Sequence, residues 1–183
     1  MIKSILVPIA DGTEELEAVT IIDILRRAGT NVIVAGIDKH LVTASRGVRL
    51  MADSLITDCN GEVFDMIVLP GGMPGAEHLR DSVLLTEMLK KQESNSRWIA
   101  AICASPVVVL QHHGLLENRK ATCHPARKKD LLNQEAADLS VVVDGNCITG
   151  RGPGTAIEFS LKLVEVLYGK KKMLEVSQPL AGN

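Results

Sequence analysis

The stretch AAICASPVVVL, residues 100–110, decides the fold. Residues Trp98–Ile102 are apolar without alternation, which is typical of a strand buried on both faces. Ser105 is a favoured helix N-cap residue and Pro106 suits a first helical turn. Cys103 is therefore expected in a very tight turn between a strand and a helix. A turn of this kind lifts a side chain off the end of a sheet.

Two interpretations of Cys103 follow from this position. The N–H groups and partial positive charge of a helix N-terminus favour the thiolate, which is the reactive form of cysteine. A free cysteine is also a common small hydrophobic residue in a core. Cys59 and Cys147 lack the setting of a tight turn and are interpreted as structural, whereas Cys123 stays open because it precedes His124.

The rest of the chain alternates strands with helices, in one domain over residues 1–183. Several strands are apolar throughout, which indicates a mostly parallel sheet covered on both faces. Asp144-Gly145 favours a tight hairpin turn. The predicted fold is an α/β three-layer sandwich with one antiparallel hairpin. The predicted strands are Lys3–Ile9, Asn31–Ile37, Met66–Leu69, Trp98–Ile102 and the hairpin pair Leu139–Val143 and Asn146–Thr149, with a possible strand end at Ala121–His124; the predicted helices are Glu14–Ala28, Gly75–Glu93, one from Pro106 and Pro153–Leu167; residues 38–62 are not assigned.

The composition excludes several classes of function. The net charge of −2 and the 2% of aromatic residues predict no nucleic-acid partner. No apolar run is long enough for a membrane span, and the first residues lack the pattern of a signal peptide, so a cytoplasmic location is expected. The four cysteines have no CxxC or CxxH spacing, which predicts no metal site.

The loops after three strands carry the candidate site, because ligands bind at the carboxyl ends of strands in an open α/β sheet. Gly71 and Gly72 follow a buried strand and let the backbone approach a ligand closely. Their N–H groups, with that of Ala104, are candidates for an oxyanion hole. The alternative is a plain turn.

Glu17 is the candidate acid–base residue beside the thiol. On a helical wheel it lies at the edge of the apolar arc of its helix, whereas Glu15 lies on the opposite, solvent side. Burial of a carboxyl group raises its pKa, which suits proton transfer near a thiol. The alternative is a carboxylate at the rim that reaches solvent.

His124, in the stretch TCHP, is the histidine best placed to act as a base or a polarising group beside Cys103. His112 and His113 are expected at the far end of the helix that follows the tight turn. The stretch GRGPGT at residues 150–155 lacks the spacing of a dinucleotide or phosphate loop, so no nucleotide cofactor is expected.

Together these stretches resemble the ThiJ/PfpI superfamily, and within it the branch of the protein deglycase linked to parkinsonism and its bacterial relatives. The resemblance covers almost the whole chain in order. It implies a flavodoxin-like sandwich, usually a homodimer. The stretches that carry it are DGTEELEAVTIIDILRRAG (11–29), SRGV (45–48), DMIVLPGGMPGAEHLRDS (65–82), AAICASP (100–106), ATCHP (121–125) and GRGPGTAIEFSLKLVEVL (150–167).

The resemblance also implies roles for single residues. Cys103 matches the reactive cysteine, and Glu17 matches a protonated glutamate that hydrogen-bonds it. Four further positions match parts of the pocket: Gly72 and Ala104 match backbone donors, His124 matches the nearby histidine, and Arg46 matches an arginine that approaches the pocket. Ala104 stands where the family's proteases have a histidine, and no histidine follows His124, so protease and glutamine amidotransferase activities are not expected.

Two functions are carried forward. The first is a cysteine-dependent, glutathione-independent glyoxalase or deglycase that acts on small 2-oxoaldehydes or on glycated protein, protects against carbonyl stress and uses no cofactor. The second is a redox sensor or stress-protective chaperone in which Cys103 is oxidised to the sulfinate.

Overall fold

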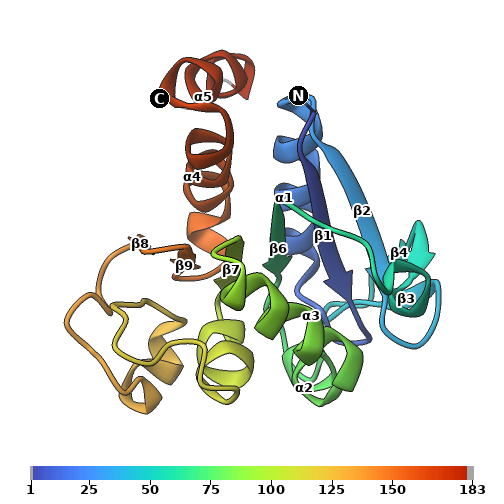
Figure 1. The fold of residues 1–183 in the computed structure, drawn as a ribbon, viewed down its shortest axis with the longest axis horizontal. Helices are drawn as coiled ribbons and strands as arrows, with labels where there is room; N and C mark the ends of the chain where they lie inside the picture. Colours follow the sequence, from blue (N-terminus) through green and yellow to red (C-terminus); the bar gives the residue numbers. More distant parts are fainter. Residues whose placement is uncertain (1, 181–183) are drawn as a thin grey trace.

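A seven-stranded sheet forms the centre of the computed structural model, which describes residues 2–180 (Figure 1). The strand order is β5-β2-β1-β6-β7-β9-β8, and every neighbouring pair is parallel except β8 and β9. This confirms the mostly parallel α/β fold with one antiparallel hairpin. The strands are β1 (Ser4–Ile9), β2 (Asn31–Gly36), β5 (Ser54–Leu55), β6 (Met66–Leu69), β7 (Trp98–Ile102), β8 (Val141–Asp144) and β9 (Cys147–Gly150).

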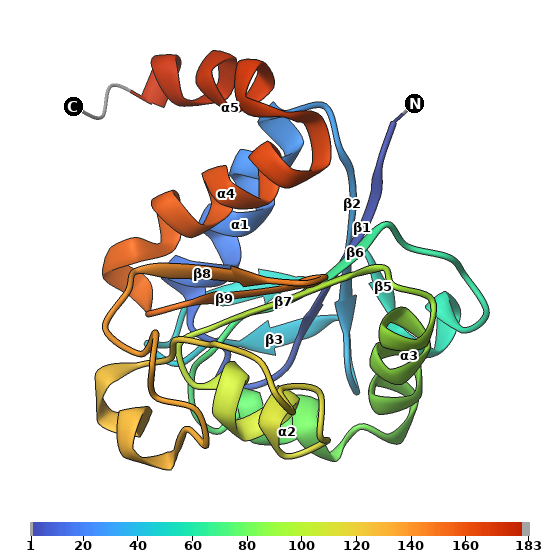
Figure 2. The ribbon, with the colours of Figure 1, turned by 60° about the vertical axis from the view of Figure 1, so that its left-hand side comes forward.

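Helices cover both faces of this sheet, as Figure 2 shows. One layer contains α1 (Glu15–Arg27) and α4 (Ala156–Tyr168), which pack against each other, and α5 (Lys170–Ser177) packs on α4. The other contains α2 (Gly75–Asp81), α3 (Val83–Ser94) and the short π-helix η2 (Pro106–Gln111). Strands β6 and β7 are almost wholly buried between the layers, which explains their uninterrupted apolar sequences.

The order of the strands places the site. The chain runs from β1 to β2 on one side, and then returns to lay β6 on the other side of β1. Crevices form at the carboxyl ends of the strands where the strand order reverses in this way. The loops after β1, β6 and β7 therefore meet at one edge of the sheet.

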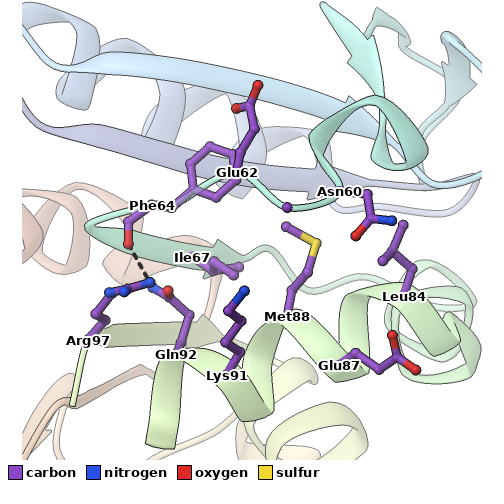
Figure 3. A pocket seen from close by; sticks show the side chains of 11 residues that line it. Asn60, Glu62, Phe64, Ile67, Leu84, Glu87, Met88, Lys91, Gln92 and Arg97 are labelled. Carbon is purple, nitrogen blue, oxygen red and sulfur yellow. Dashed lines mark hydrogen bonds between the residues drawn. The ribbon is translucent and has the colours of Figure 1, made fainter. Parts of the chain in front are cut away.

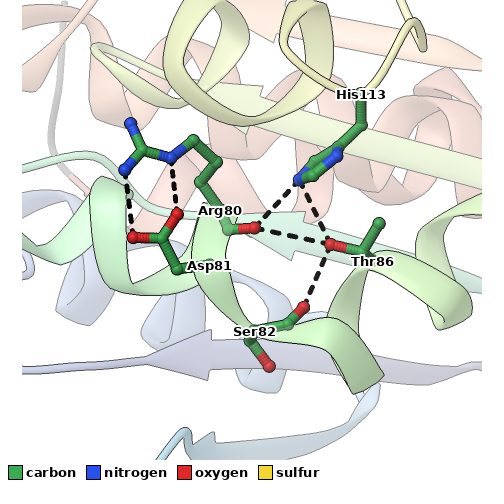
Figure 4. A network of polar contacts seen from close by, with 5 residues as sticks. All are labelled: Arg80, Asp81, Ser82, Thr86 and His113. Atoms are coloured by element: carbon green, nitrogen blue, oxygen red, sulfur yellow. Dashed lines mark hydrogen bonds and ion pairs between the residues drawn. The ribbon is translucent and has the colours of Figure 1, made fainter.

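The expected single helix over Gly75–Glu93 is wrong, because it is broken at Ser82 (Figure 4). Ser82 has an extended backbone, and its Oγ accepts a hydrogen bond of 3.4 Å from the N–H of Leu85 at the start of α3. Thr86 Oγ1 donates to the Ser82 carbonyl at 3.0 Å, and His113 Nε2 donates to the Arg80 carbonyl at 2.9 Å. His113 thus gives the Arg80 carbonyl, near the end of α2, a donor. The Ser82 carbonyl also accepts from the N–H of Thr86 at 3.0 Å, as the first hydrogen bond of α3.

Other boundaries also differ from the expectation. The possible strand end at Ala121–His124 is wrong, since these residues have no regular structure. The unassigned residues 38–62 hold a separate two-stranded antiparallel sheet of β3 (Leu41–Thr43) and β4 (Arg49–Met51), followed by β5 and a 3-10 turn over Ile56–Cys59. Further 3-10 turns lie at Pro125–Asp130, Pro153–Thr155 and Gln178–Leu180. Within residues 2–180, the structure contains no helix that is both long and apolar enough to cross a membrane.

Candidate active site

Cys103 occupies the sharp turn after β7 that the sequence predicts. Its φ of +66° lies in the left-handed region, which is rare for any residue other than glycine. Its N–H donates to the Gly150 carbonyl at 3.0 Å, and its own carbonyl accepts from the N–H of His124 at 2.8 Å. Neighbouring strands and loops thus hold the strained backbone, as is common at functional sites.

Ser105 does not cap the helix that follows. Its backbone is already helical, with φ −64° and ψ −31°, and no N–H bonds to its side chain. Instead its buried Oγ donates to the carbonyl of Pro70 at 2.5 Å. The expected cap is therefore wrong, and the hydroxyl ties the turn after β7 to the turn after β6.

Glu17 lies on α1 and is fully buried, which decides between its two interpretations. Its Oε2 accepts a hydrogen bond of 2.8 Å from the N–H of Gly71. Its Oε1 is the one buried side-chain nitrogen or oxygen in residues 2–180 that has no hydrogen-bond partner. The carboxyl group interacts with the Cys103 thiol closely enough for each to shift the pKa of the other.

Gly71 lies between the side chains of Glu17 and Cys103, and there is no space for a side chain of its own. A Cβ atom at this position would lie 2.6 Å from Cβ of Cys103 and 2.8 Å from Oε2 of Glu17. Distances this short do not occur for real side chains, so only glycine fits. The backbone of Gly71 therefore approaches both side chains closely and brings Glu17 and Cys103 together, whereas its approach to a ligand stays a prediction.

The electrostatics of the pair follow from burial. Burial raises the pKa of Glu17 to about 7, although the Gly71 N–H lowers it. Burial also raises the pKa of Cys103 to about 12, and the charge of Glu17 adds to this rise. The backbone N–H groups of Gly72 and Ala104 lower the pKa of Cys103, but by less. The expectation that the turn alone yields a thiolate is thus wrong, because burial outweighs the two N–H groups. Near pH 7 Glu17 is about half ionised, while the thiol keeps its proton.

Gly72 and Ala104 lie where backbone donors are expected. Both act on the Cys103 sulfur through their N–H groups. Gly72 has a φ of +90°, and a Cβ atom there would lie 2.3 Å from the nitrogen of Glu14. The turn after β6 therefore needs glycine twice in succession.

The backbone N–H of His124 binds the carbonyl of Cys103 in the sharp turn after β7. The half-buried ring of His124 makes contacts elsewhere. Nδ1 accepts a hydrogen bond of 3.2 Å from the N–H of Ala126, so Nε2 carries the proton of the neutral ring. The ring borders an open cavity of about 350 Å³ that the loop 151–155, including Arg151, also lines. No hydrogen bond joins this ring to Cys103 or Glu17 in the part of the chain that the structure describes.

Arg46 lies in the turn between β3 and β4 and is exposed. Its N–H donates to Oε1 of Glu15 at 2.8 Å, and Ser45 Oγ donates to Oε2 of Glu15 at 2.8 Å. The expected solvent position of Glu15 is therefore wrong, because it is 9% exposed and binds this turn. Sequence reasoning missed Ser45, and no local signal marks it.

The remaining cysteines are buried free thiols. Burial raises the pKa of Cys147 to about 12 and that of Cys123 to about 11, and it also raises the pKa of Cys59. Cys123 donates to the carbonyl of His124 at 3.5 Å. No three His, Cys, Asp or Glu residues between positions 2 and 180 are placed to hold a metal ion.

Comparison with known proteins places this geometry in a family. Residues 3–166 match the model of the DJ-1/PfpI family. Over 95% of this chain, the sequence is 51% identical to Protein DJ-1 homolog B of Arabidopsis thaliana. The chain spans only 40% of the length of that relative and 46% of the length of Protein DJ-1 homolog A of the same plant. It is 38% identical to "Glutathione-independent glyoxalase DJR-1.2" of Caenorhabditis elegans, with 96% of this chain and 94% of the relative covered.

A solved structure shares the whole fold. The structure titled "Toxoplasma gondii DJ-1, oxidized" superposes with a TM-score of 0.95 at 48% identity, and 97% of each chain is covered. The sequence and the fold of this chain thus match the same family. The chain belongs to the DJ-1/PfpI family.

Proposed function

We propose that the protein is a glutathione-independent glyoxalase or deglycase that acts on 2-oxoaldehydes, such as methylglyoxal, or on their protein adducts. The observation that carries the proposal is the buried pair of Glu17 and Cys103, in which the pKa of Glu17 is raised to about 7. A group with a pKa near the working pH is suited both to accept and to return a proton. The name of the nematode relative supports the same reaction class.

The first step joins the thiol to the aldehyde. The Cys103 sulfur attacks the aldehyde carbon while its proton passes to Glu17, and the carbonyl π electrons become an alkoxide on the aldehyde oxygen. The N–H groups of Gly72 and Ala104 stabilise this oxyanion. Glu17 then returns the proton to the oxygen, which gives a neutral hemithioacetal and an ionised Glu17.

The second step moves a proton between neighbouring carbons. Glu17 removes the proton from the former aldehyde carbon, and the electron pair of that C–H bond forms an enediolate with the adjacent ketone. Nε2–H of His124 polarises the ketone oxygen. Glu17 delivers its proton to the second carbon, and the hydroxyl proton on the first carbon passes to the oxygen of the second. This leaves a neutral 2-hydroxy thioester on Cys103. Water hydrolyses the thioester to lactate and regenerates the thiol. In this proposal Arg46 binds the substrate or the product carboxylate, close to Gly71.

Production of lactate from methylglyoxal without glutathione tests the proposal. We expect turnover in the wild type and its loss in Cys103→Ser, because serine is a far weaker nucleophile. Cys59→Ser is the matched control, because Cys59 is also a buried thiol but lies outside the site and has no role in the mechanism. Equal turnover in Cys103→Ser, with the fold verified by circular dichroism, would contradict the mechanism. Release of free amine from a glycated peptide then separates adduct repair from removal of free aldehyde.

A redox-sensing or chaperone role is the second candidate. The supporting observation is the likeness to a structure whose title states an oxidised form. Cys103 is 9% exposed and is the thiol whose sulfur interacts with both Gly72 and Ala104 N–H groups, which would also stabilise a sulfinate. Mass spectrometry after mild peroxide treatment tests this role. It requires oxidation at Cys103 before the other cysteines, and oxidation elsewhere with Cys103 unmodified would rule it out.

A homodimer in the cytoplasm completes the proposal. Leu16 and Val19 on α1 and Ile157 on α4 are about half exposed although they are apolar, and α1 and α4 pack side by side. A self-associating face would remove this surface from water. Light scattering after size-exclusion chromatography measures the oligomeric state, and fractionation of cells measures the location.

A further inference from the structure

A second cavity, shown in Figure 3, is lined by residues at the end of the sheet opposite to Cys103. It has a volume of about 170 Å³ and lies between α3 and the loop that leads into β6. Phe64 precedes β6 and Arg97 precedes β7, so the cavity is at the amino-terminal ends of these strands. No residue of the Cys103 site lines it, and the proposed reaction does not use it.

Gln92 supplies a fixed polar group in this cavity. Its side chain is 3% exposed, and Nε2 donates hydrogen bonds of 3.2 Å to the carbonyls of both Phe64 and Trp98. Both N–H bonds of the amide are thereby used. A flipped amide would place its oxygen against two carbonyl oxygens, so the orientation of the amide is determined.

The amide oxygen of Gln92 is consequently an acceptor without a donor. No residue in positions 2–180 donates to Oε1 of Gln92. This oxygen is also not sealed off from solvent, because within residues 2–180 the one fully enclosed side-chain atom without a partner is Oε1 of Glu17. Gln92 lines the cavity and is its most deeply buried polar side chain, so its Oε1 is an acceptor fixed in the cavity wall. Because no residue donates to this oxygen, its hydrogen-bond partner is water or another molecule that enters the cavity.

The walls define what such a molecule looks like. Phe64, Ile67, Leu84 and Met88 give an apolar lining. The ring of Phe64 and the thioether of Met88 both make favourable contacts with flat rings. The rim carries two carboxylates, Glu62 and Glu87, and two cations, Lys91 and Arg97, so it selects neither sign of charge. An apolar cavity of roughly 150 Å³ is known to hold benzene.

We propose that this cavity binds a small, uncharged heteroaromatic molecule of one or two rings with an N–H donor. The ring lies against the apolar lining, and its N–H donates to Oε1 of Gln92. Indole is the probe, and benzofuran is its matched control, because it has the same shape with an oxygen in place of the N–H.

Titration of the ¹⁵N-labelled protein by NMR tests the proposal. We expect indole to shift the Gln92 side-chain and Phe64 amide signals saturably, with benzofuran binding about tenfold more weakly, as leaving a buried acceptor unpaired implies. Leu84 is half-buried and lines the cavity, so the larger side chain in Leu84→Trp should fill the cavity and abolish binding. Val83→Trp adds the same side chain at the neighbouring, 73% exposed position outside the cavity and should leave binding unchanged.

Three results would overturn the inference. They are the absence of saturable shifts up to the solubility limit of indole, equal binding of benzofuran, and unchanged binding in Leu84→Trp. Cys103→Ser should bind indole like the wild type. A failure of the glyoxalase proposal is therefore distinguishable from a failure of this one.

Discussion

The N–H of Gly71 donates a hydrogen bond of 2.8 Å to Oε2 of Glu17, and this contact fixes the carboxyl group of Glu17 beside Cys103. It uses Oε2 and leaves Oε1 without a hydrogen-bond partner, so one oxygen of the carboxyl group is free to take up a proton. Because Gly71 follows β6, Glu17 follows the loop after β1 and Cys103 follows β7, the pair depends on three strand ends at once.

The first prediction concerns stability and pH. The pKa of Glu17 is raised from 4.5 to about 7, so the folded state holds this proton more tightly than the unfolded chain does. The stability that Glu17 contributes is present below pH 4.5 and is lost as the pH rises through 7. At pH 8 we expect Glu17→Gln to unfold with a free energy about 3 kcal/mol higher than the wild type, at about 1.4 kcal/mol per pKa unit.

Urea denaturation at pH 5 and pH 8 measures this difference. Glutamine keeps an oxygen for the Gly71 N–H but has no charge to bury. The variant should therefore lose most of the pH dependence between these values. A wild type and a variant with the same pH dependence would show that Glu17 has an ordinary pKa.

The second prediction concerns the reactivity of Cys103. The charge of Glu17 raises the pKa of the thiol, so the rate of alkylation should change as Glu17 titrates near pH 7. Glu17→Gln removes the titrating group, and the inflection near pH 7 should disappear. Iodoacetamide labelling, followed by mass spectrometry of the Cys103 peptide, measures the rate. Identical profiles in both proteins would separate Glu17 from the thiol.

The third prediction concerns Gly71. In Gly71→Ala the new methyl group collides with Cβ of Cys103 and Oε2 of Glu17, so the turn must shift. We expect loss of lactate formation and a loss of stability on the order of 1–3 kcal/mol, as for other overpacked positions. Gly154→Ala is the control for stability, because a Cβ there meets no atom within 4 Å. Equal melting temperatures of the two variants would contradict the close packing at Gly71.

The fourth prediction concerns Ser105. Ser105→Ala leaves the carbonyl of Pro70 without its buried donor, which should lower the free energy of unfolding by about 1–3 kcal/mol. Ser94→Ala also removes a hydroxyl bonded to a carbonyl, but at an exposed site, and should change stability by less than about 0.5 kcal/mol. Thermal denaturation compares them, and a similar small effect in both would show that the Ser105 bond contributes little.

The sequence predicts the parts of this site that depend on local pattern. The uninterrupted apolar strands indicate the parallel sheet, and Cys103 between Ile102 and Pro106 indicates the sharp turn. The position of Glu17 at the edge of an apolar arc indicates its burial. Each of these signals lies within one element and its neighbours, so one stretch of sequence suffices.

Contacts between distant segments could not be predicted in the same way. Ser105 looks like a helix cap, but its hydroxyl bonds to Pro70, 35 residues away. Glu15 looks solvent-facing on its own helix, but the turn containing Ser45 and Arg46 folds over it. The pKa of Cys103 likewise depends on burial and on a carboxyl group from another element, and these outweigh the local effect of the turn.

Glu17 is expected to stay protonated beside Cys103 at pH values where an exposed glutamate is ionised. Infrared difference spectroscopy detects the C=O stretch of a protonated carboxyl group directly, and Glu17→Gln assigns the band. The expected result is a band that is present at pH 6, titrates with a midpoint near 7 and is absent in the variant. A Glu17 band that disappears around pH 4.5 would contradict it.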